Sequence, residues 1–188
     1  MELTPEQLNI LEGHYSLLSR WNRVLNLTSV EGVAEAVERH YCESIFLAVQ
    51  LPVGKLRIVD IGSGGGFPGF PIAVLRTDCE ISLVESHRRK AVFLREASRG
   101  IGNIRVCARR AEEVEEGFDR AVSRAVSYKD LQGVLKELAP VADLLTGEET
   151  PPEELGFDWA DGMRLPWGKA RYLRSGVLRG TPWSQRFT

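Results

Sequence analysis

The spacing of the hydrophobic residues changes near residue 55 of the chain. In the first 54 residues, apolar side chains recur at steps of three and four, as on the buried face of an amphipathic helix. The first such run contains Leu8, Leu11, Tyr15 and Leu18. It starts with the capping box Thr4-Pro5-Glu6-Gln7, in which Thr4 is the N-cap. Further helices are predicted over residues 31–39 and 41–49, so residues 1–54 are expected to form an N-terminal helical cap.

From residue 56 onward, short apolar runs alternate with helical patterns. The apolar runs predict five strands, over residues 58–61, 80–85, 104–107, 118–123 and 141–146. Helices are predicted between them, one capped by Ser86 and one over residues 128–138. This alternation is typical of a mostly parallel sheet with helices on both faces. Residues 55–188 are therefore predicted to be a doubly wound α/β domain, with an exposed acidic loop over 148–161 and a terminal hairpin over 163–177.

The first predicted strand runs into a glycine-rich loop. Asp60 lies near the end of the strand, and Gly62, Gly64 and Gly66 follow at every second position. Four glycines in five positions indicate a backbone that turns sharply or lies directly against a ligand. Phe67 stands where the dinucleotide fingerprint has its third glycine. The loop resembles that of a Rossmann-like class I methyltransferase that depends on S-adenosylmethionine (SAM), so Asp60, Gly62, Gly64 and Gly66 are expected to bind this cofactor.

Polar residues follow the next three strands at the same edge of the predicted sheet. Glu85 comes 25 residues after Asp60, where a carboxylate can accept hydrogen bonds from both ribose hydroxyls of a nucleoside. Ala111 and Glu112 follow the third strand and are expected near the adenine. Arg124 follows the fourth strand and would place a fixed cation near the cofactor or an incoming base. In an open α/β sheet, ligands bind beyond these strand ends.

Composition excludes several classes of protein and site. No run of 18 apolar residues occurs, and the N-terminus lacks the profile of a signal peptide, so a cytoplasmic protein without a membrane segment is expected. The three cysteines lack metal-ligand spacing, so no metal is expected. The formal net charge of −2 means that contact with a polyanion would depend on local patches. Candidate patches are Arg88-Arg89-Lys90 with Arg95 and Arg99, then Arg105, Arg109 and Arg110, and the basic tail over 162–188.

Several short motifs together resemble one family. They are Asn26-Leu27-Thr28, Arg39-His40 with Glu43-Ser44, the loop Asp60 to Pro71, Glu85-Ser86, Arg89-Lys90, Phe93-Leu94-Arg95, Ala111-Glu112 and Ser123-Arg124-Ala125. The chain resembles the glucose-inhibited division protein B family (RsmG), bacterial guanine-N7 methyltransferases of small-subunit ribosomal RNA. The resemblance covers about residues 5 to 176. Where the family has Asp-Ser, this chain has Glu43-Ser44 and Glu85-Ser86, and the family's Lys-Gly after the fifth strand is Thr146-Gly147 here.

The resemblance implies a function and a site. The positions matching Gly62 and Phe67 would hold SAM, those matching Ala111 and Glu112 would contact its adenine side, and Arg124 would lie at the methyl-transfer end. His40, in the cap, would lie near the mouth of the site and is a second catalytic candidate. The implied partner is 16S ribosomal RNA or the small ribosomal subunit, and the expected oligomeric state is a monomer. A base-modifying reaction at guanine N7 needs no general base, because N7 carries a free lone pair.

Three alternatives remain open on the sequence alone. The chain could be a SAM-dependent methyltransferase that acts on another RNA or on a small molecule. It could be a nicotinamide-dependent dehydrogenase, which the missing third glycine disfavours. It could also be a SAM-binding homologue that has lost transfer activity, which Thr146 in place of the family's lysine makes conceivable.

Overall fold

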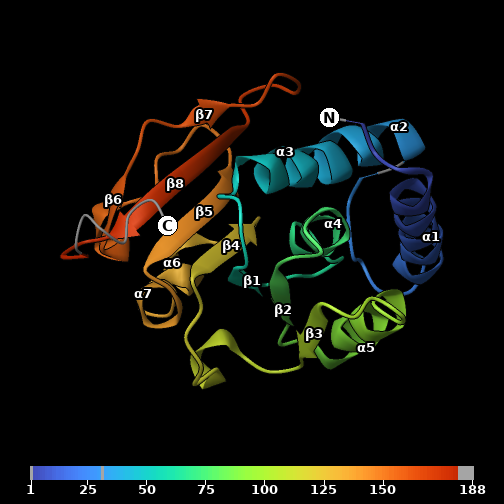
Figure 1. Cartoon of the computed structure of the whole chain (residues 1–188), viewed down its shortest axis with the longest axis horizontal. Coiled ribbons are helices and arrows are strands. Elements are labelled where there is room, and N and C mark those ends of the chain that lie inside the picture. The colour runs from blue at the N-terminus through green and yellow to red at the C-terminus, as the bar shows by residue number, and fades with distance from the viewer. Residues whose placement is uncertain (1, 31, 182–188) are drawn as a thin grey trace.

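A mixed sheet forms the centre of the molecule (Figure 1). The computed structural model describes residues 2–30 and 32–181, and within them the sheet has the strand order β3-β2-β1-β4-β5-β8-β6, with β7 paired to β8. The strands are β1 (Arg57–Ile61), β2 (Glu80–Val84), β3 (Ile104–Cys107), β4 (Arg120–Arg124), β5 (Val141–Thr146), β6 (Phe157–Trp159), β7 (Met163–Arg164) and β8 (Tyr172–Leu178). Strands β1 to β5 are parallel and β8 is antiparallel to β5. The predicted doubly wound α/β fold is confirmed.

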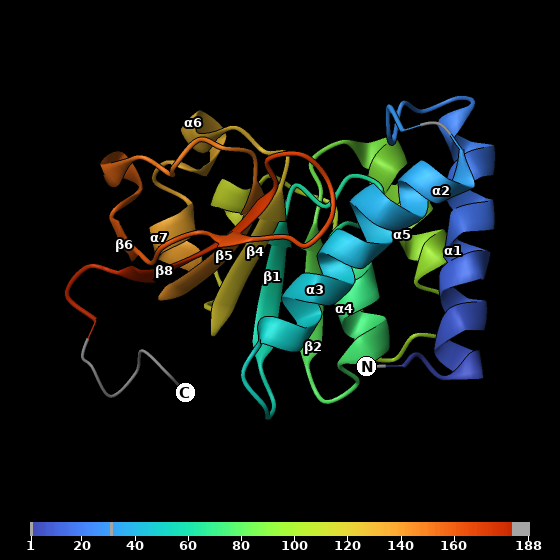
Figure 2. The ribbon, with the colours of Figure 1, turned by 90° about the horizontal axis from the view of Figure 1, so that it is seen from above.

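Each face of the sheet carries its own hydrophobic core, because successive side chains of a strand point to opposite faces. Ile58 belongs to one core with Ile81, and Val59 belongs to the other with Val84. Helices α1, α3, α4 and α5 cover the first face, and α6 and α7 cover the second (Figure 2). Their bounds are α1 (Pro5–Asn22), α3 (Glu43–Gln50), α4 (Gly69–Leu75), α5 (Arg88–Ala97), α6 (Tyr128–Leu131) and α7 (Leu135–Leu138).

The N-terminal helices share a core with the sheet. The predicted capping box of α1 is present, with Thr4 accepting from the Gln7 backbone amide. The predicted break between helices at residue 40 is wrong, because α2 (Val33–Ala36) continues through a π-helical stretch, η1 (Val37–Cys42), into α3. His40 is buried in this stretch, so tertiary packing holds the helix together where its sequence suggested an interruption. Residue 31 lies outside the described residues, and the domain boundary at residue 54 stays a prediction.

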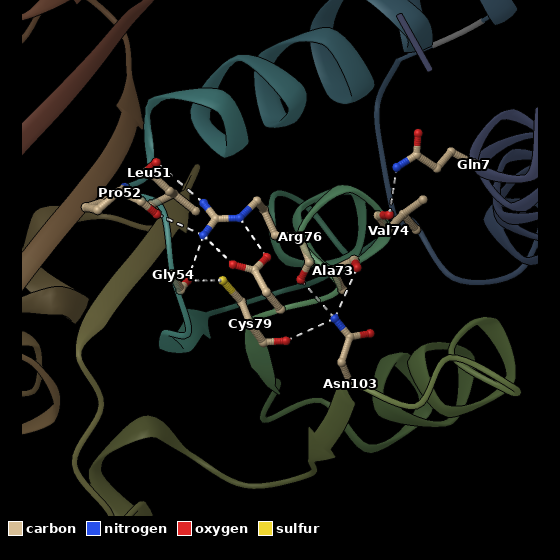
Figure 3. Close-up of polar contacts among 10 residues, drawn as sticks. Gln7, Leu51, Pro52, Gly54, Ala73, Val74, Arg76, Cys79 and Asn103 are labelled. Carbon is tan, nitrogen blue, oxygen red and sulfur yellow. Dashed lines mark hydrogen bonds and ion pairs between the residues drawn. The ribbon is translucent and has the colours of Figure 1, made fainter. Parts of the chain in front are cut away.

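Side-chain hydrogen bonds connect the N-terminal helical cap to the sheet at the end far from the glycine loop (Figure 3). The Arg76 side chain donates to the carbonyls of Leu51, Pro52 and Gly54 at 3.4, 2.8 and 2.8 Å, and pairs with Asp78. Asn103 Nδ2 donates to three further carbonyls, those of Ala73, Arg76 and Cys79. These bonds give side-chain donors to carbonyls in the loops before β1 and β2 and in the last turn of α4. The chain from α3 to β1 is therefore held against the turn after α4.

Several predicted element boundaries differ from the structure. The fourth strand begins at Arg120 and includes Arg124, and the cap of α5 is His87, whose ring accepts from the Lys90 amide, in place of Ser86. The predicted helix over 128–138 is two short helices, because Gly133, with φ of 86°, lies between them. The predicted exposed loop over 148–161 contains the buried Phe157 of β6. Burial of this aromatic side chain is favourable enough to order the segment despite the acidic residues around it.

The C-terminal hairpin is present as β7 and β8, and β8 completes the sheet beside β5. It explains the carboxylate of Asp143 inside the apolar strand β5. Asp143 is 3% exposed, pairs with Arg120 Nη1 at 2.7 Å and accepts from Ser175 Oγ at 2.6 Å. A buried charge is tolerated when it is paired and hydrogen-bonded, and β4 and β8 supply both partners. Residues 182–188 of the predicted basic tail lie outside the described residues.

Candidate functional site

Asp60 supports the glycine loop through a buried hydrogen bond. Its side chain points to the face of the sheet that α4 covers, and Oδ2 accepts from the Gly69 amide at 2.9 Å. A Cβ on Gly69 would lie 2.4 Å from Leu83 Cδ2 and 2.7 Å from that same carboxylate oxygen, so only glycine fits there. Burial raises the pKa of Asp60 to about 7. Asp60 is fully buried and therefore supports the loop, while its predicted contact with the cofactor stays a prediction.

Glu85 joins the glycine loop to the end of β2. Its Oε2 accepts from the Gly64 amide at 2.9 Å and its Oε1 accepts from the His87 amide at 2.7 Å. A carboxylate oxygen has two acceptor sites, so each oxygen keeps capacity for a ribose hydroxyl. Glu85 is 7% exposed and lies at the strand ends, as the sequence predicts. Its contact with ribose stays a prediction.

Two cavities share Gly62 as a lining residue. The first, which we call the Arg124 cavity, has a volume of about 350 Å³ and is lined by His40, Gly62, Gly64, Phe67 and Arg124 among others. The second, the Ala111 cavity, has a volume of about 310 Å³ and includes Gly62, Ala111 and Glu112 in its lining. Gly62 has φ of 71°, and a Cβ there would lie 2.5 Å from Val126 Cγ2. Glycine is therefore required at this position, which lines both cavities.

The structure thus brings together most of the predicted site residues. Ala111 and Glu112 begin the 3-10 turn η2 (Ala111–Glu113) on one side of Gly62, and Arg124 ends β4 on the other. Gly66 lines neither cavity, because it packs between His14 and Phe70. An elongated ligand with a nucleoside at one end and a charged group at the other fits this pair of cavities. SAM has that form, so the residues present are compatible with it.

An aromatic cluster forms the wall of the Arg124 cavity. The rings of His40 and Phe67 stack, with centroids 4.7 Å apart and planes inclined at 29°. His40 Nε2 lies 2.6 Å from Thr28 Oγ1, which fixes the ring to the loop before α2. Burial, together with the charge of Arg124, lowers the pKa of His40 to about 3. His40 is consequently neutral at physiological pH and can orient Phe67, and its catalytic role stays a prediction.

His14 is a buried residue beside the site that sequence reasoning missed. It lies on the α1 face with Leu11 and Leu18, stacks on Phe70 at 4.1 Å and holds Tyr41 Oη at 2.6 Å from Nδ1. Burial lowers its pKa to about 3. Its helical spacing from Leu11 and Leu18 could have revealed it as part of the buried face. His14 therefore supports the glycine loop and Phe67 from behind.

Arg124 is the cation at the inner end of its cavity. Its Nη1 donates to the carbonyl of Arg39 in η1, and its guanidinium lies over Phe67, with Cζ 5.6 Å from the ring centroid. The same Nη1 is 3.6 Å from Oε2 of Glu43. Burial lowers the pKa of Arg124 to about 10, so it remains charged at neutral pH. Ala125, the next residue, has φ of 59°, and such left-handed backbone at a non-glycine residue is common at functional sites.

The predicted basic residues are spread over several surfaces. Lys90 lines the Arg124 cavity, and Arg109 and Arg110 line the Ala111 cavity. Arg105 of β3 pairs with Glu116, and neither residue lines the Arg124 cavity or the Ala111 cavity. Thr146 ends β5 opposite Tyr172 of β8, and its hydroxyl donates to the Gly147 carbonyl at 3.1 Å. Lys90, Arg109 and Arg110 are therefore the predicted cations that the structure places at the site.

Neither a metal cluster nor a membrane-spanning helix is found within residues 2–30 and 32–181. Over these two ranges, no group of three or more His, Cys, Asp or Glu side chains is arranged to hold a metal ion. In the same part of the chain, no helix has the length and apolar character needed to cross a bilayer. The cytoplasmic location and the monomeric state stay predictions.

Solved structures with the same fold include methyltransferases. A SAM-dependent methyltransferase from Aquifex aeolicus superposes with a TM-score of 0.60 at 13% identity, covering 87% of this chain and 97% of that one. The fibrillarin pre-rRNA processing protein of Methanococcus jannaschii gives a TM-score of 0.60 at 15% identity, covering 74% of this chain and 76% of that one. At these identities the likeness establishes the fold alone.

Sequence relatives are closer. Ribosomal RNA small subunit methyltransferase G of Chromobacterium violaceum is 38% identical over 131 residues, which cover 68% of this chain and 62% of the relative. The protein of the same name from Halorhodospira halophila is 38% identical over 150 residues, covering 78% of this chain and 65% of the relative. The chain thus matches less than two thirds of the length of these relatives. The sequence model of the GidB family, described as rRNA small subunit methyltransferase G, matches residues 7–142. The chain belongs to the GidB family.

Proposed function

We propose that this protein transfers a methyl group from SAM to N7 of a guanine in 16S ribosomal RNA. The observation that carries the proposal is a pair of cavities that share Gly62 in their linings, one with Arg124 and the other with Ala111, beside the bond between Glu85 and the Gly64 amide. Membership of the GidB family supports the same reaction and substrate class.

Each part of the site has a distinct task in this proposal. The Ala111 cavity would hold the adenosine, and the Arg124 cavity would hold the methionine end and the target base. Glu85, which lines neither cavity but directly follows β2 beside the glycine loop, would accept from the ribose hydroxyls. When bound, SAM would supply an electrophilic methyl group to the lone pair of guanine N7, with S-adenosylhomocysteine as the leaving product. Arg124 orients the base or the cofactor carboxylate by charge-assisted hydrogen bonds. Phe67 offers an aromatic surface on which a base can stack.

No proton has to be moved by the protein in this reaction. The lowered pKa of His40 agrees with that, because it makes the imidazole a weak base at neutral pH. Catalysis would then consist of positioning and exclusion of water, which can supply a large share of a barrier reduction. We propose accordingly that His40 acts by holding Phe67 in place through its stacked ring.

Two measurements test the proposal. Calorimetric titration with S-adenosylhomocysteine and with NAD distinguishes the methyltransferase from the nicotinamide-dependent alternative, and we expect heat with the first only. Glu85→Gln should weaken S-adenosylhomocysteine binding, whereas Glu80→Gln, which removes the same charge from the exposed start of β2, should not. Equal binding by both variants would remove Glu85 from the proposed site.

The second measurement is transfer itself. Protein is incubated with labelled SAM and small ribosomal subunits from a strain that lacks the modification, and label is expected at N7 of one guanine. Label in another RNA or in a small molecule would favour the alternative substrate. S-adenosylhomocysteine binding without label in any of them would favour a homologue that has lost transfer, as the substitution at Thr146 allows.

A further inference from the structure

A buried carboxylate near the Arg124 cavity is shared by two arginines from distant parts of the chain. Glu43, the first residue of α3, is 1% exposed. Arg171, in the turn between β7 and β8, binds it with two parallel bonds, Nε to Oε1 at 2.9 Å and Nη2 to Oε2 at 3.0 Å. Arg124 approaches the same carboxylate only to 3.6 Å. Arg171 therefore occupies both oxygens of Glu43.

The charge of Arg171 opposes a closer approach of Arg124 to Glu43, because the two guanidinium groups repel each other. A guanidinium has five N–H donors, and a buried carboxylate is its strongest nearby acceptor. In the part of the chain that the structure describes, the hydrogen bond found for Arg124 runs to the Arg39 carbonyl, so most of its donors stay uncommitted. If Glu43 were free, Arg124 could replace the 3.6 Å approach with a two-bond pair of its own. That shift would move the guanidinium toward Glu43, which does not line the Arg124 cavity.

The C-terminal hairpin places Arg171 from the far end of the fold. Thr146 of β5 lies opposite Tyr172 of β8, so Arg171 comes directly before the residue that faces Thr146. Trp167 in the same turn packs edge-on against Phe46 of α3, with ring centroids 5.8 Å apart. Packing on α3 and pairing with β5 thus fix the turn on both sides. The Arg171 side chain is 27% exposed and that of Glu43 is 2% exposed, so Arg171 shields Glu43 from solvent.

We propose that Arg171 is a positioning residue for methyl transfer: by occupying Glu43, it keeps the Arg124 guanidinium directed into the cavity beside Phe67. This inference rests on the proposed function for its kinetic readout but not for its structural one. It assigns to the C-terminal hairpin a task in the site. Arg171 does not line the Arg124 cavity or the Ala111 cavity, so it acts through Glu43.

The test uses a variant and its suppressor. Arg171→Met frees Glu43, so we expect Arg124 to pair with it and methyl transfer to small subunits to fall on the order of 10- to 100-fold. Arg171→Met combined with Glu43→Gln removes the carboxylate that attracts Arg124 and should restore much of the activity. Arg171→Lys keeps one bond to Glu43 and should be intermediate. Arg57→Met, which removes one charge from an exposed pair at the opposite end of the sheet, is the matched control and should retain activity.

A crystal structure of Arg171→Met gives a readout that does not need activity. The expected result is Arg124 hydrogen-bonded to both oxygens of Glu43, closer than the present 3.6 Å. Arg124 unmoved in that structure would overturn the inference, and so would a double variant no more active than folded Arg171→Met. If Arg171→Met does not fold, Arg171→Lys and the double variant carry the same comparison. A wild-type protein that transfers no methyl group would contradict the proposed function, while the structure of the variant would still decide the positioning role.

Discussion

The guanidinium carbon of Arg124 lies 5.6 Å from the centre of the Phe67 ring, so the cation of the site sits over an aromatic face. Such an arrangement contributes about 1 kcal/mol, or roughly fivefold in an equilibrium constant. Phe67→Leu keeps most of the apolar volume and removes the ring. We expect methyl transfer to fall at least by that factor, measured as kcat/KM for small subunits.

The control for this prediction is a matching pair elsewhere in the fold. Arg57 Cζ lies 5.4 Å from the centre of the Phe118 ring at the opposite end of the sheet, and Phe118 and Phe67 are each 6% exposed. Phe118→Leu should lower the free energy of unfolding about as much as Phe67→Leu does, and it should leave methyl transfer unchanged. An equal loss of transfer in both variants would mean that stability alone is measured.

Gly62 lines both cavities, and a side chain at this position should obstruct ligand binding. Gly62→Ala would put Cβ 2.5 Å from Val126 Cγ2 at a φ of 71°, where left-handed backbone costs an L-residue about 1 kcal/mol or more. We expect S-adenosylhomocysteine binding, measured by calorimetry, to be abolished or to weaken more than tenfold, since each tenfold step is about 1.4 kcal/mol.

A second substitution separates the two causes. Val126→Ala in the Gly62→Ala background removes the clash but leaves the backbone conformation, so binding should recover in part. Gly102→Ala, at a position with no atom within 4 Å of the new Cβ, should bind normally. Full binding by Gly62→Ala would show that the ligand does not approach the backbone there.

Arg88 and Arg89 stand in the first turn of α5, where cations oppose the helix dipole. Both are exposed, and Lys90 beside them lines the Arg124 cavity. Replacing both with Ala should leave the protein slightly more stable, by about 0.3 to 1 kcal/mol per residue at low salt. It should also weaken RNA binding and reduce the slope of log K against log salt by about 0.7 to 0.9 for each phosphate that the variant no longer neutralises.

RNA affinity measured at several salt concentrations checks this prediction. The charge-matched control is Lys129→Ala with Lys136→Ala, on α6 and α7, which cover the other face of the sheet. The same change in slope for both double variants would indicate an effect of net charge in place of a local interaction. A lower stability of the Arg88 and Arg89 variant would show that these residues serve the fold.

His14 makes stability depend on pH. Its pKa is lowered from 6.5 to about 3 in the folded protein because of burial, whereas the unfolded chain takes up a proton below pH 6.5. The stability that neutral His14 allows is therefore present above pH 6.5 and is lost as the pH falls toward 3. The slope for one proton is about 1.4 kcal/mol per pH unit.

His14→Gln keeps a hydrogen bond to Tyr41 and removes the titration. Urea unfolding between about pH 7 and pH 4 should show a shallower loss of stability for this variant than for the wild type. The exposed His87 is the control, and His87→Gln should keep the wild-type slope. An unchanged slope in His14→Gln would mean that His14 accepts its proton without cost in the folded state.

The sequence by itself determined the five parallel strands and the edge of the sheet at which the candidate site lies. Strand and helix periodicities are local, and so is the turn chemistry that puts Asp60, Gly62 and Gly64 after β1. Since parallel strands end at one edge, Glu85, Ala111 and Arg124 could be assigned to one site before their surroundings were known. The same reasoning identified the capping box at Thr4 and the hairpin over 163–177.

Only the tertiary structure decided which distant side chains meet. The pairing of Glu43 with Arg171 joins residues 128 positions apart, and Asp143 finds Arg120 on β4 and Ser175 on β8. His14 lies behind Phe67 only because α1 packs on α4 and α5. Burial strengthens these interactions by removing the competing water, and no local pattern encodes it. The chain's local periodicities therefore placed the strand ends, and packing between its N-terminal helices and its C-terminal hairpin decided how the cation of the site is held.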